Sequence, residues 1–196
     1  MDGPRFVPRP PRQLSGAALE VHDDIVRTRA GLARVTDVTG PDGELLGPFG
    51  LLVESPEIGD AVQRVGTALR EHAALPPPAV EAAILTVAQH WDAGYEWSAH
   101  EAVARASGAL DDATIDLLRA GRPVASPPSA AVANAVTTQV LTTHGIDDDL
   151  YAAAVAEFGE RGTIDLTLLI GYYVHLAILI TASRNRVGRS GKELSP

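Results

Sequence analysis

The sequence predicts an all-α fold, a helical bundle of about seven to eight helices. Through most of the chain, apolar residues recur at the three- and four-residue spacing that places them on one face of a helix. The alternating, β-branched runs that mark strands are nearly absent, and only residues 35–38 suggest extended structure. Since the chain has 196 residues, 45% of them hydrophobic, we expect one well-buried domain rather than two.

Prolines and turn residues divide the first part of the chain. Residues 1–14 are proline-rich and are expected to form an extended N-terminal arm, followed by the single domain over residues 15–187. A first helix is expected to begin after Ser15, a possible cap, and to end near Gly31. Pro56 suits the first turn of a second helix, which should stop before the next proline run.

Glycine, aspartate and proline separate the helices that follow. Gly94 divides a helix that ends near Trp91 from the next one, and Gly108 stands where a left-handed cap commonly ends a helix. Asp111 or Asp112 can cap a short helix after it. The expected helices here cover residues 77–91, 95–107, 112–120, 130–143, 147–158 and 163–184, and residues 188–196 are expected to be disordered.

The composition excludes several classes of function. The net charge is −9, from 25 acidic and 16 basic residues, and no dense basic run occurs, so nucleic acid is not an expected partner. The chain has no cysteine, which excludes disulfides, thiolate metal sites and thiol peroxidase chemistry. The first residues lack the apolar segment of a secretory signal, and we therefore expect a cytoplasmic protein.

Residues 166–182 form an almost wholly apolar segment. Its length is at the lower limit for a membrane span, and Gly171, Tyr172, Tyr173 and His175 interrupt its centre. We therefore expect no membrane insertion. A helix that is apolar on every side should instead be buried all round, in the core or in a subunit interface.

A glutamate and a histidine four residues apart, Glu96 and His100, form the main candidate site. On a helix this spacing places both side chains on one face. A carboxylate that hydrogen-bonds an imidazole fixes its tautomer and raises its basicity, which suits a histidine to proton transfer. The spacing alone also fits an ordinary contact on a packed helix.

Other residues could line a pocket around this pair. His90 could approach His100 if the chain reverses at Gly94, or it could be a half-buried histidine bonded to a backbone carbonyl. His175 shares a helix face with Tyr172 and is either satisfied structurally or directed at a cavity. The candidates for substrate binding are Tyr95, Trp97, His90, Tyr172 and His175.

The remaining titratable residues give weaker signals. By composition alone Glu81 is expected on the outer face of its helix, since an internal carboxylate would have a raised pKa or a cationic neighbour. No His-Glu-x-x-His motif occurs, and Glu96 and His100 are not at the Glu-x-x-His spacing of di-iron bundles, so no metal site is expected. Polar or turn-adjacent surroundings place the other histidines on the surface, namely His22, His72 and His144.

Taken together, Glu81, the Tyr-Glu-Trp-x-x-His element that ends at His100, and Gly108 resemble the carboxymuconolactone decarboxylase family, within the AhpD-like superfamily. This element is the most specific part of the likeness. The resemblance spans most of the chain and includes residues 43–49, Ser55, Pro56, residues 81–108, residues 171–173 and Asn185.

The resemblance implies a proton relay without a thiol. In the peroxidase branch of the superfamily, a glutamate, a cysteine pair and a histidine act together. Glu81 and His100 match the glutamate and the histidine, whereas Ala93 and Glu96 occupy the cysteine positions. The match therefore moves Glu81 from the expected surface into the expected pocket.

The decarboxylase branch, as the resemblance implies, acts on an anionic lactone acid. A basic residue commonly precedes the glutamate in that branch, but Val80 precedes Glu81 here. This difference puts the usual substrate in question, and Arg184 or Arg186 could supply a charge for a carboxylate.

The leading hypothesis is a small lyase or isomerase that needs no cofactor. His100 would move a proton next to a carbonyl or lactone of a small organic acid or polyketide-like substrate, Glu96 would orient it and Glu81 would extend the relay. The resemblance also implies a homo-oligomer, a dimer, trimer or hexamer. The alternative is a non-catalytic ligand-binding or structural oligomer, and metal-assisted chemistry is a third possibility.

Overall fold

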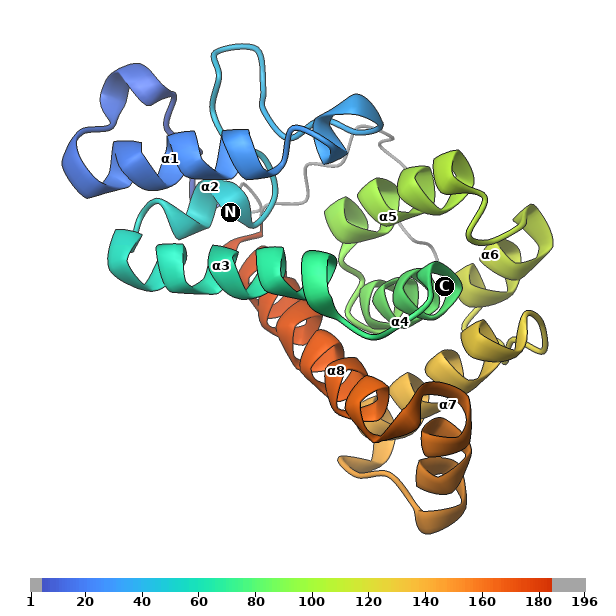
Figure 1. Cartoon of the computed structure of the whole chain (residues 1–196). Coiled ribbons are helices and arrows are strands. Elements are labelled where there is room, and N and C mark those ends of the chain that lie inside the picture. Colours follow the sequence, from blue (N-terminus) through green and yellow to red (C-terminus); the bar gives the residue numbers. More distant parts are fainter. Residues whose placement is uncertain (1–4, 185–196) are drawn as a thin grey trace.

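The computed structural model describes residues 5–184, and in this range the protein has eight α-helices and no β-strand (Figure 1). The predicted all-α fold class is therefore confirmed. An antiparallel bridge joins Thr39 to Leu45. The helices are α1 (Gly16–Thr28), α2 (Phe49–Leu52), α3 (Pro56–His72), α4 (Pro77–His90), α5 (Gly94–Ser107), α6 (Asp112–Arg119), α7 (Pro128–Thr143) and α8 (Asp148–Ser183).

The helix ends follow the local chemistry of the sequence. Asp111 caps α6 by accepting a hydrogen bond from the backbone N–H of Thr114. Gly108 ends α5 in the left-handed conformation, with a φ of 68°. The two helices expected over residues 147–158 and 163–184 form one element, α8, which is broken by a non-helical residue at Gly159, with a φ of 71°.

The segment between α1 and α3 differs most from the expectation. Residues 35–38 form no strand, and the short helix α2 was not anticipated. Its buried residues Phe49 and Leu52 pack with Val21 and Ile25 of α1 in a small hydrophobic cluster. This segment therefore folds around long-range contacts, which a local periodicity does not reveal.

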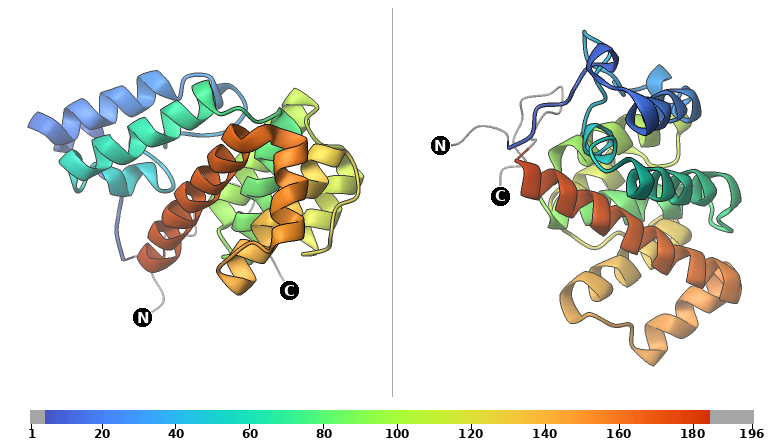
Figure 2. Two further views of the ribbon diagram at one scale, coloured as in Figure 1. Left: turned by 60° about the horizontal axis from the view of Figure 1, so that its bottom comes forward. Right: turned by 90° about the vertical axis from the view of Figure 1, so that its left-hand side faces the viewer.

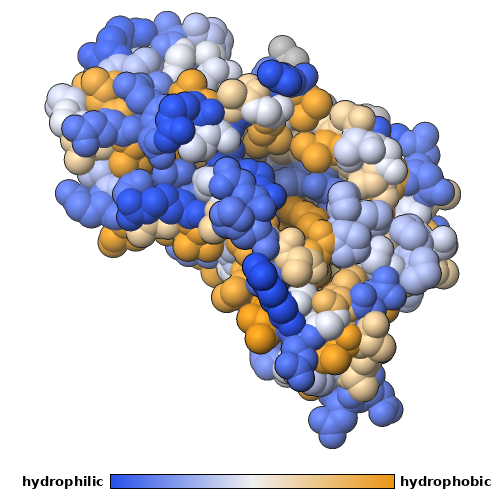
Figure 3. Space-filling model, in the orientation of Figure 1, coloured by the Kyte–Doolittle hydropathy of each residue, from blue (hydrophilic) through white to orange (hydrophobic). Residues whose placement is uncertain are grey.

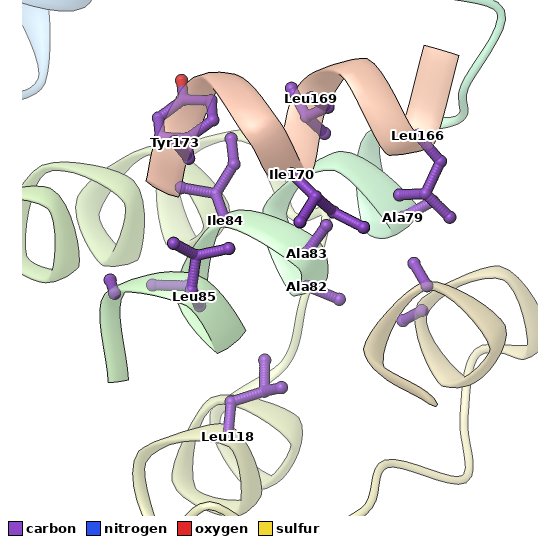
Figure 4. Packing of buried hydrophobic residues seen from close by; sticks show 14 of the residues in the cluster. Ala79, Ala82, Ala83, Ile84, Leu85, Leu118, Leu166, Leu169, Ile170 and Tyr173 are labelled. Atoms are coloured by element: carbon purple, nitrogen blue, oxygen red, sulfur yellow. The ribbon is translucent and has the colours of Figure 1, made fainter. Parts of the chain in front are cut away.

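Helix α4 lies at the centre of the main hydrophobic core. It contacts α5, α6, α7 and α8, and the residues from Ala82 to Ala88 are all buried. Small residues on α4 allow close approach, as Figure 4 shows for Ala82 and Ala83 near Ile170 of α8. The polar side chains of the enclosed part of α4, Glu81 and Thr86, therefore lie inside the protein.

The N-terminal arm runs to the far end of α8. The backbone N–H of Arg5 donates to the carbonyl of Ser183 at 2.8 Å, and the Arg5 guanidinium donates to the carbonyl of Ala182. Arg9 forms a two-pronged ion pair with Glu54, at 2.8 and 3.0 Å. The expected arm is thus held against the helices, and the expected tail over residues 188–196 lies outside the described residues.

Helix α8 is buried on one side only. By length and composition it could cross a membrane, but half of its most apolar window is buried inside the protein, and α8 contributes Leu166, Leu169 and Ile170 to the core. The expected burial on every side does not occur within one chain, because Ile164 and Leu168 are more than half exposed.

Candidate active site

A pocket of about 510 Å³ lies between α1, α3, α4, α5 and α8. Its size is typical of sites for small organic molecules. Figure 3 shows a hollow between the part of the surface formed by α1 and α3 and the part formed by α5, with hydrophobic residues inside it. Most of its lining is apolar, and its charged or titratable lining residues are Arg29, Arg70, Glu81, Glu96, Tyr95, His100, Tyr172 and Tyr173.

The central interaction of the pocket joins His100 to Glu81. The Nδ1–H of His100 donates a hydrogen bond of 2.9 Å to Oε2 of Glu81. Helices α4 and α5 are neighbours, and a tight turn in which Asp92 has a φ of 50° connects them. The side chains of His100 and Glu81 are only 12% and 9% exposed, so this pair is shielded from bulk water.

The surroundings of His100 raise its pKa. Burial is the largest influence and lowers the pKa, but the charge and hydrogen bond of Glu81, with the charge of Glu96, outweigh it. Arg29 acts weakly in the opposite direction. His100 therefore holds its proton to a higher pH than a free imidazole, even inside an apolar pocket.

Glu96 lies on the same face of α5 as His100, as the spacing predicts. Its Oε2 is 3.8 Å from Nε2 of His100, which is beyond hydrogen-bond distance. Its Oε1 is buried and has no hydrogen-bond partner among residues 5–184. Burial raises the pKa of Glu96, although the charges of His100 and Arg29 lower it. Glu96 therefore holds its proton to a higher pH than a free carboxylic acid, and its Oε1 is available to a ligand.

Arg29 supplies a buried cation that the sequence did not reveal. It follows the end of α1, is only 1% exposed, and lies over the ring of Phe49 at 5.2 Å. Its guanidinium donates to the hydroxyl of Thr67 at 3.1 Å and to the carbonyl of Gln63 at 3.5 Å. Both acceptors are neutral, so within the described part of the chain its charge has no ion-pair partner.

Gly66 on α3 leaves room for the polar groups of the pocket. A Cβ atom at this position would lie 2.1 Å from the Tyr172 hydroxyl and 3.0 Å from Nη2 of Arg29. Burial raises the pKa of Tyr172 to about 12, although the nearby charge of Arg29 lowers it. The phenol therefore remains a neutral hydrogen-bond donor beside a fixed positive charge.

Two further tyrosines shape the wall near His100. The ring of Tyr173 meets that of His100 edge to face, with centroids 5.1 Å apart. The hydroxyl of Tyr95 donates to the carbonyl of Asp37 at 3.1 Å, and Gly47 leaves space for its ring. Burial raises the pKa of both phenols. These contacts hold the aromatic wall and the imidazole in fixed orientations.

The structure brings together Glu81, Glu96, His100, Tyr95 and Tyr172, but three predicted pocket residues lie elsewhere. Trp97 points to the other side of α5, where its indole N–H donates to Glu101 and Arg119 covers its ring. His90 and His175 are exposed and do not line the pocket. Helical phase explains all three, because each residue faces away from the side of its helix that bears the pocket.

The arginines that line the pocket, Arg29 and Arg70, also differ from the expected sources of positive charge. Arg184 is exposed at the end of α8 and does not line the pocket, and Arg186 lies outside the described residues. Among the other histidines, His72 and His144 are exposed as predicted. His22 is buried instead, and its Nε2 is 2.9 Å from the carbonyl of Gly43, because the loop after α1 folds back over it.

Residues 5–184 contain no group of three or more His, Cys, Asp or Glu side chains placed to hold a metal ion.

Comparisons with known proteins give no further guide to the site. The chain matches no protein-family model, and no curated protein is significantly similar to it. The resemblance to the carboxymuconolactone decarboxylase family therefore stays a prediction.

Proposed function

We propose that the protein is an acid/base enzyme that needs no cofactor and transfers a proton at a carbon next to a carbonyl or lactone group. The observation that carries the proposal is the His100–Glu81 pair in the wall of a pocket that also contains the buried cation Arg29. Buried, coupled titratable groups at a cavity are a common feature of catalytic sites. The lyase or isomerase activity implied by the family resemblance is part of this proposal.

His100 would carry the proton through its Nε2 atom. Glu81 accepts the hydrogen bond from Nδ1–H, which directs the proton-accepting nitrogen away from α4. In a decarboxylation, the bond between the carboxylate carbon and its neighbour breaks, carbon dioxide leaves, and the electron pair passes into the adjacent carbonyl as an enolate. Protonated His100 then gives its proton to the carbon. The raised pKa of His100 keeps this acid available near neutral pH.

Arg29 would bind the anionic part of the substrate. Its charge has only neutral acceptors among the described residues, and burial raises the pKa of the nearby Glu96. The pocket therefore favours an added negative charge near Arg29, while its largely apolar lining suits a compact carbon skeleton. A small organic acid that bears a carbonyl or lactone group fits both features.

A screen against lactones, β-keto acids and polyketide-like carbonyl compounds tests the proposal. The wild type is compared with His100→Gln and Arg29→Met, and Glu101→Gln, one residue along α5 but outside the pocket lining, is the control. We expect His100→Gln to lower turnover by about 10²–10⁴-fold. Arg29→Met should mainly raise KM for acidic substrates, and Glu101→Gln should change neither. Equal turnover by wild type and His100→Gln would refute the role of His100.

The alternative function is ligand binding without catalysis, and one observation favours it. Arg29 is almost wholly enclosed, and its guanidinium is fixed by protein contacts, as in a site that holds an anion tightly. In that case acidic compounds from the same screen would bind with affinity that depends on Arg29 but not on His100. Calorimetric titration of the three variants with the best-binding acid separates the two functions.

A further inference from the structure

Helix α8 carries an exposed stripe that has no partner within the described chain. Ile164, Leu168 and Ile178 are 58%, 56% and 45% exposed. In the right-hand view of Figure 2, no other helix lies in front of α8. The stripe consists of Ile164, Leu168, Gly171, His175, Ile178 and Ala182, all exposed, and we call it the α8 stripe.

The spacing of the α8 stripe is that of a helix–helix seam. Its residues follow one another at intervals of four, three, four, three and four, which keeps them in line along about 27 Å of helix. Large exposed apolar surface of this kind marks an interaction site. The opposite face of α8 is built into the core, so insertion into a membrane would require the protein to unfold.

The terminal segments of this sequence have little apolar character to match the stripe. Residues 1–4 and 185–196 contain only Met1, Val187 and Leu194 as larger apolar residues apart from proline. These are too few and too scattered to match a continuous seam. A continuous apolar surface on another molecule matches the stripe better than these two short segments do.

We infer that a second copy of this chain covers the α8 stripe, with the two α8 helices antiparallel about a two-fold axis. The interval pattern reads the same in both directions, so an antiparallel copy aligns stripe residue with stripe residue. Leu168 then meets Ile178, Ile164 meets the small Ala182, and His175 meets Gly171. A Cβ atom at Gly171 would meet nothing within 4 Å, so the space for His175 exists. Large residues thus face small ones in two of the three kinds of pair, and in the third Leu168 packs against Ile178.

Charge also favours this pairing. The chain has a net charge of −9, so two copies repel each other over most surfaces, but residues 166–183 contain no Asp, Glu, Lys or Arg. Antiparallel alignment brings the Arg184 end of each copy to the Glu160 end of the other. Arg161 at that end is already paired with Asp165, at 3.7 Å. This inference does not depend on the proposed function, because no stripe residue lines the pocket.

A charge swap on the full chain tests the pairing. In sedimentation velocity at about 1–100 µM, we expect a dimer for the wild type and a monomer for Leu168→Lys and for Ile178→Glu. The double variant Leu168→Lys/Ile178→Glu should recover the dimer, because antiparallel pairing places the new lysine against the new glutamate twice. Ile58→Lys, an equally exposed apolar residue on α3, is the matched control and should stay dimeric.

Cysteine cross-linking gives a second, independent measurement, since the natural chain has no cysteine. Leu168→Cys/Ile178→Cys should form a covalent dimer on mild oxidation, whereas Leu168→Cys alone should not, because its own copy lies about 15 Å along the helix. A monomeric wild type, a dimer that survives Leu168→Lys, or cross-linking of the single variant would overturn the inference. A monomer that binds phosphatidylcholine vesicles through the stripe would overturn it as well.

Discussion

Two neighbouring residues of α5, His100 and Glu101, form two ion-pair systems of opposite character. His100 hydrogen-bonds Glu81 at 2.9 Å inside the pocket wall. Glu101 pairs with Arg119 at 2.7 Å and Arg105 at 3.1 Å on the other side of the helix, where the arginine side chains are about 40% exposed. The distances are alike, and the difference between the systems is burial.

Burial affects the pKa values of the two groups differently, although the distances to their partners are alike. For Glu101 burial raises the pKa, but the hydrogen bonds from Arg119, Trp97 and Arg105 outweigh it, so the pKa is lowered and the group stays a carboxylate. For His100 burial is again the largest single influence, and only the charge and hydrogen bond of Glu81 keep the proton on the ring. The charged state of His100 therefore depends mainly on one carboxylate, Glu81. The charged state of Glu101 is supported by several hydrogen-bond donors at once.

The largest expected effect is on proton transfer, through Glu81→Gln. Without the carboxylate charge, the remaining burial should lower the pKa of His100 from above 6.5 to below it. Turnover should fall by about 10²-fold or more, with the pH–rate profile shifted to lower pH. NMR titration of the imidazole measures the pKa directly. Glu101→Gln is the control, and an unchanged His100 pKa in Glu81→Gln would remove the distinction between the two systems.

The next effect is on stability. Removing one member of a buried ion pair leaves the other without compensation, so Glu81→Ala should lower the free energy of unfolding by about 3–5 kcal/mol at pH 6. Glu101→Ala, in the exposed network, should cost about 0–1 kcal/mol. Urea unfolding measures both changes. Equal losses of unfolding free energy in the two variants would show that burial does not make the Glu81 pair more important for stability than the Glu101 network.

Much of the fold could be predicted from periodicity and caps, but the site could be predicted only in part. Spacing along one helix correctly placed Glu96 and His100 on one face. Glu81 looked exposed by composition, since nothing local shows that α4 is enclosed on every side. Arg29 gave no signal at all, because it reaches the pocket from the end of α1, through contacts with α2 and α3.

Aromatic character was wrong as a guide to the pocket at Trp97, although Tyr95 and Tyr172 do line it. Trp97 flanks Glu96 in sequence, yet a one-residue step turns a side chain by about 100° around a helix. Trp97 therefore joins Glu101 and Arg119 on the opposite side. The exposed stripe of α8 shows the same limit, because an apolar helix can face the core on one side and another molecule on the other.

A smaller change in stability is expected for Glu96→Gln, and it is a gain rather than the loss expected for Glu81→Ala. The folded state raises its pKa, so the protein binds this proton more tightly when folded, and that contribution to stability is lost as pH rises from about 4.5 through the folded pKa. Glu96→Gln keeps the shape without the titration. The variant should have the same stability as the wild type at pH 4 and should become progressively more stable than it as the pH rises to 8. A stability difference that does not grow with pH would contradict the raised pKa.

The smallest effect is expected at Arg105, in the exposed network. Arg105 contacts both Glu101 and Asp112, but its side chain is 42% exposed, so water and salt screen the attraction. Arg105→Ala should lower the free energy of unfolding by only about 0.2–1 kcal/mol, and half-molar salt should remove most of that difference. The effect of Glu81→Ala should persist in the same salt, since that pair is buried. Thermal unfolding of both variants with and without salt makes the comparison. If salt also reduced the stability loss in Glu81→Ala, the His100–Glu81 pair would be screened by solvent like the Arg105 network.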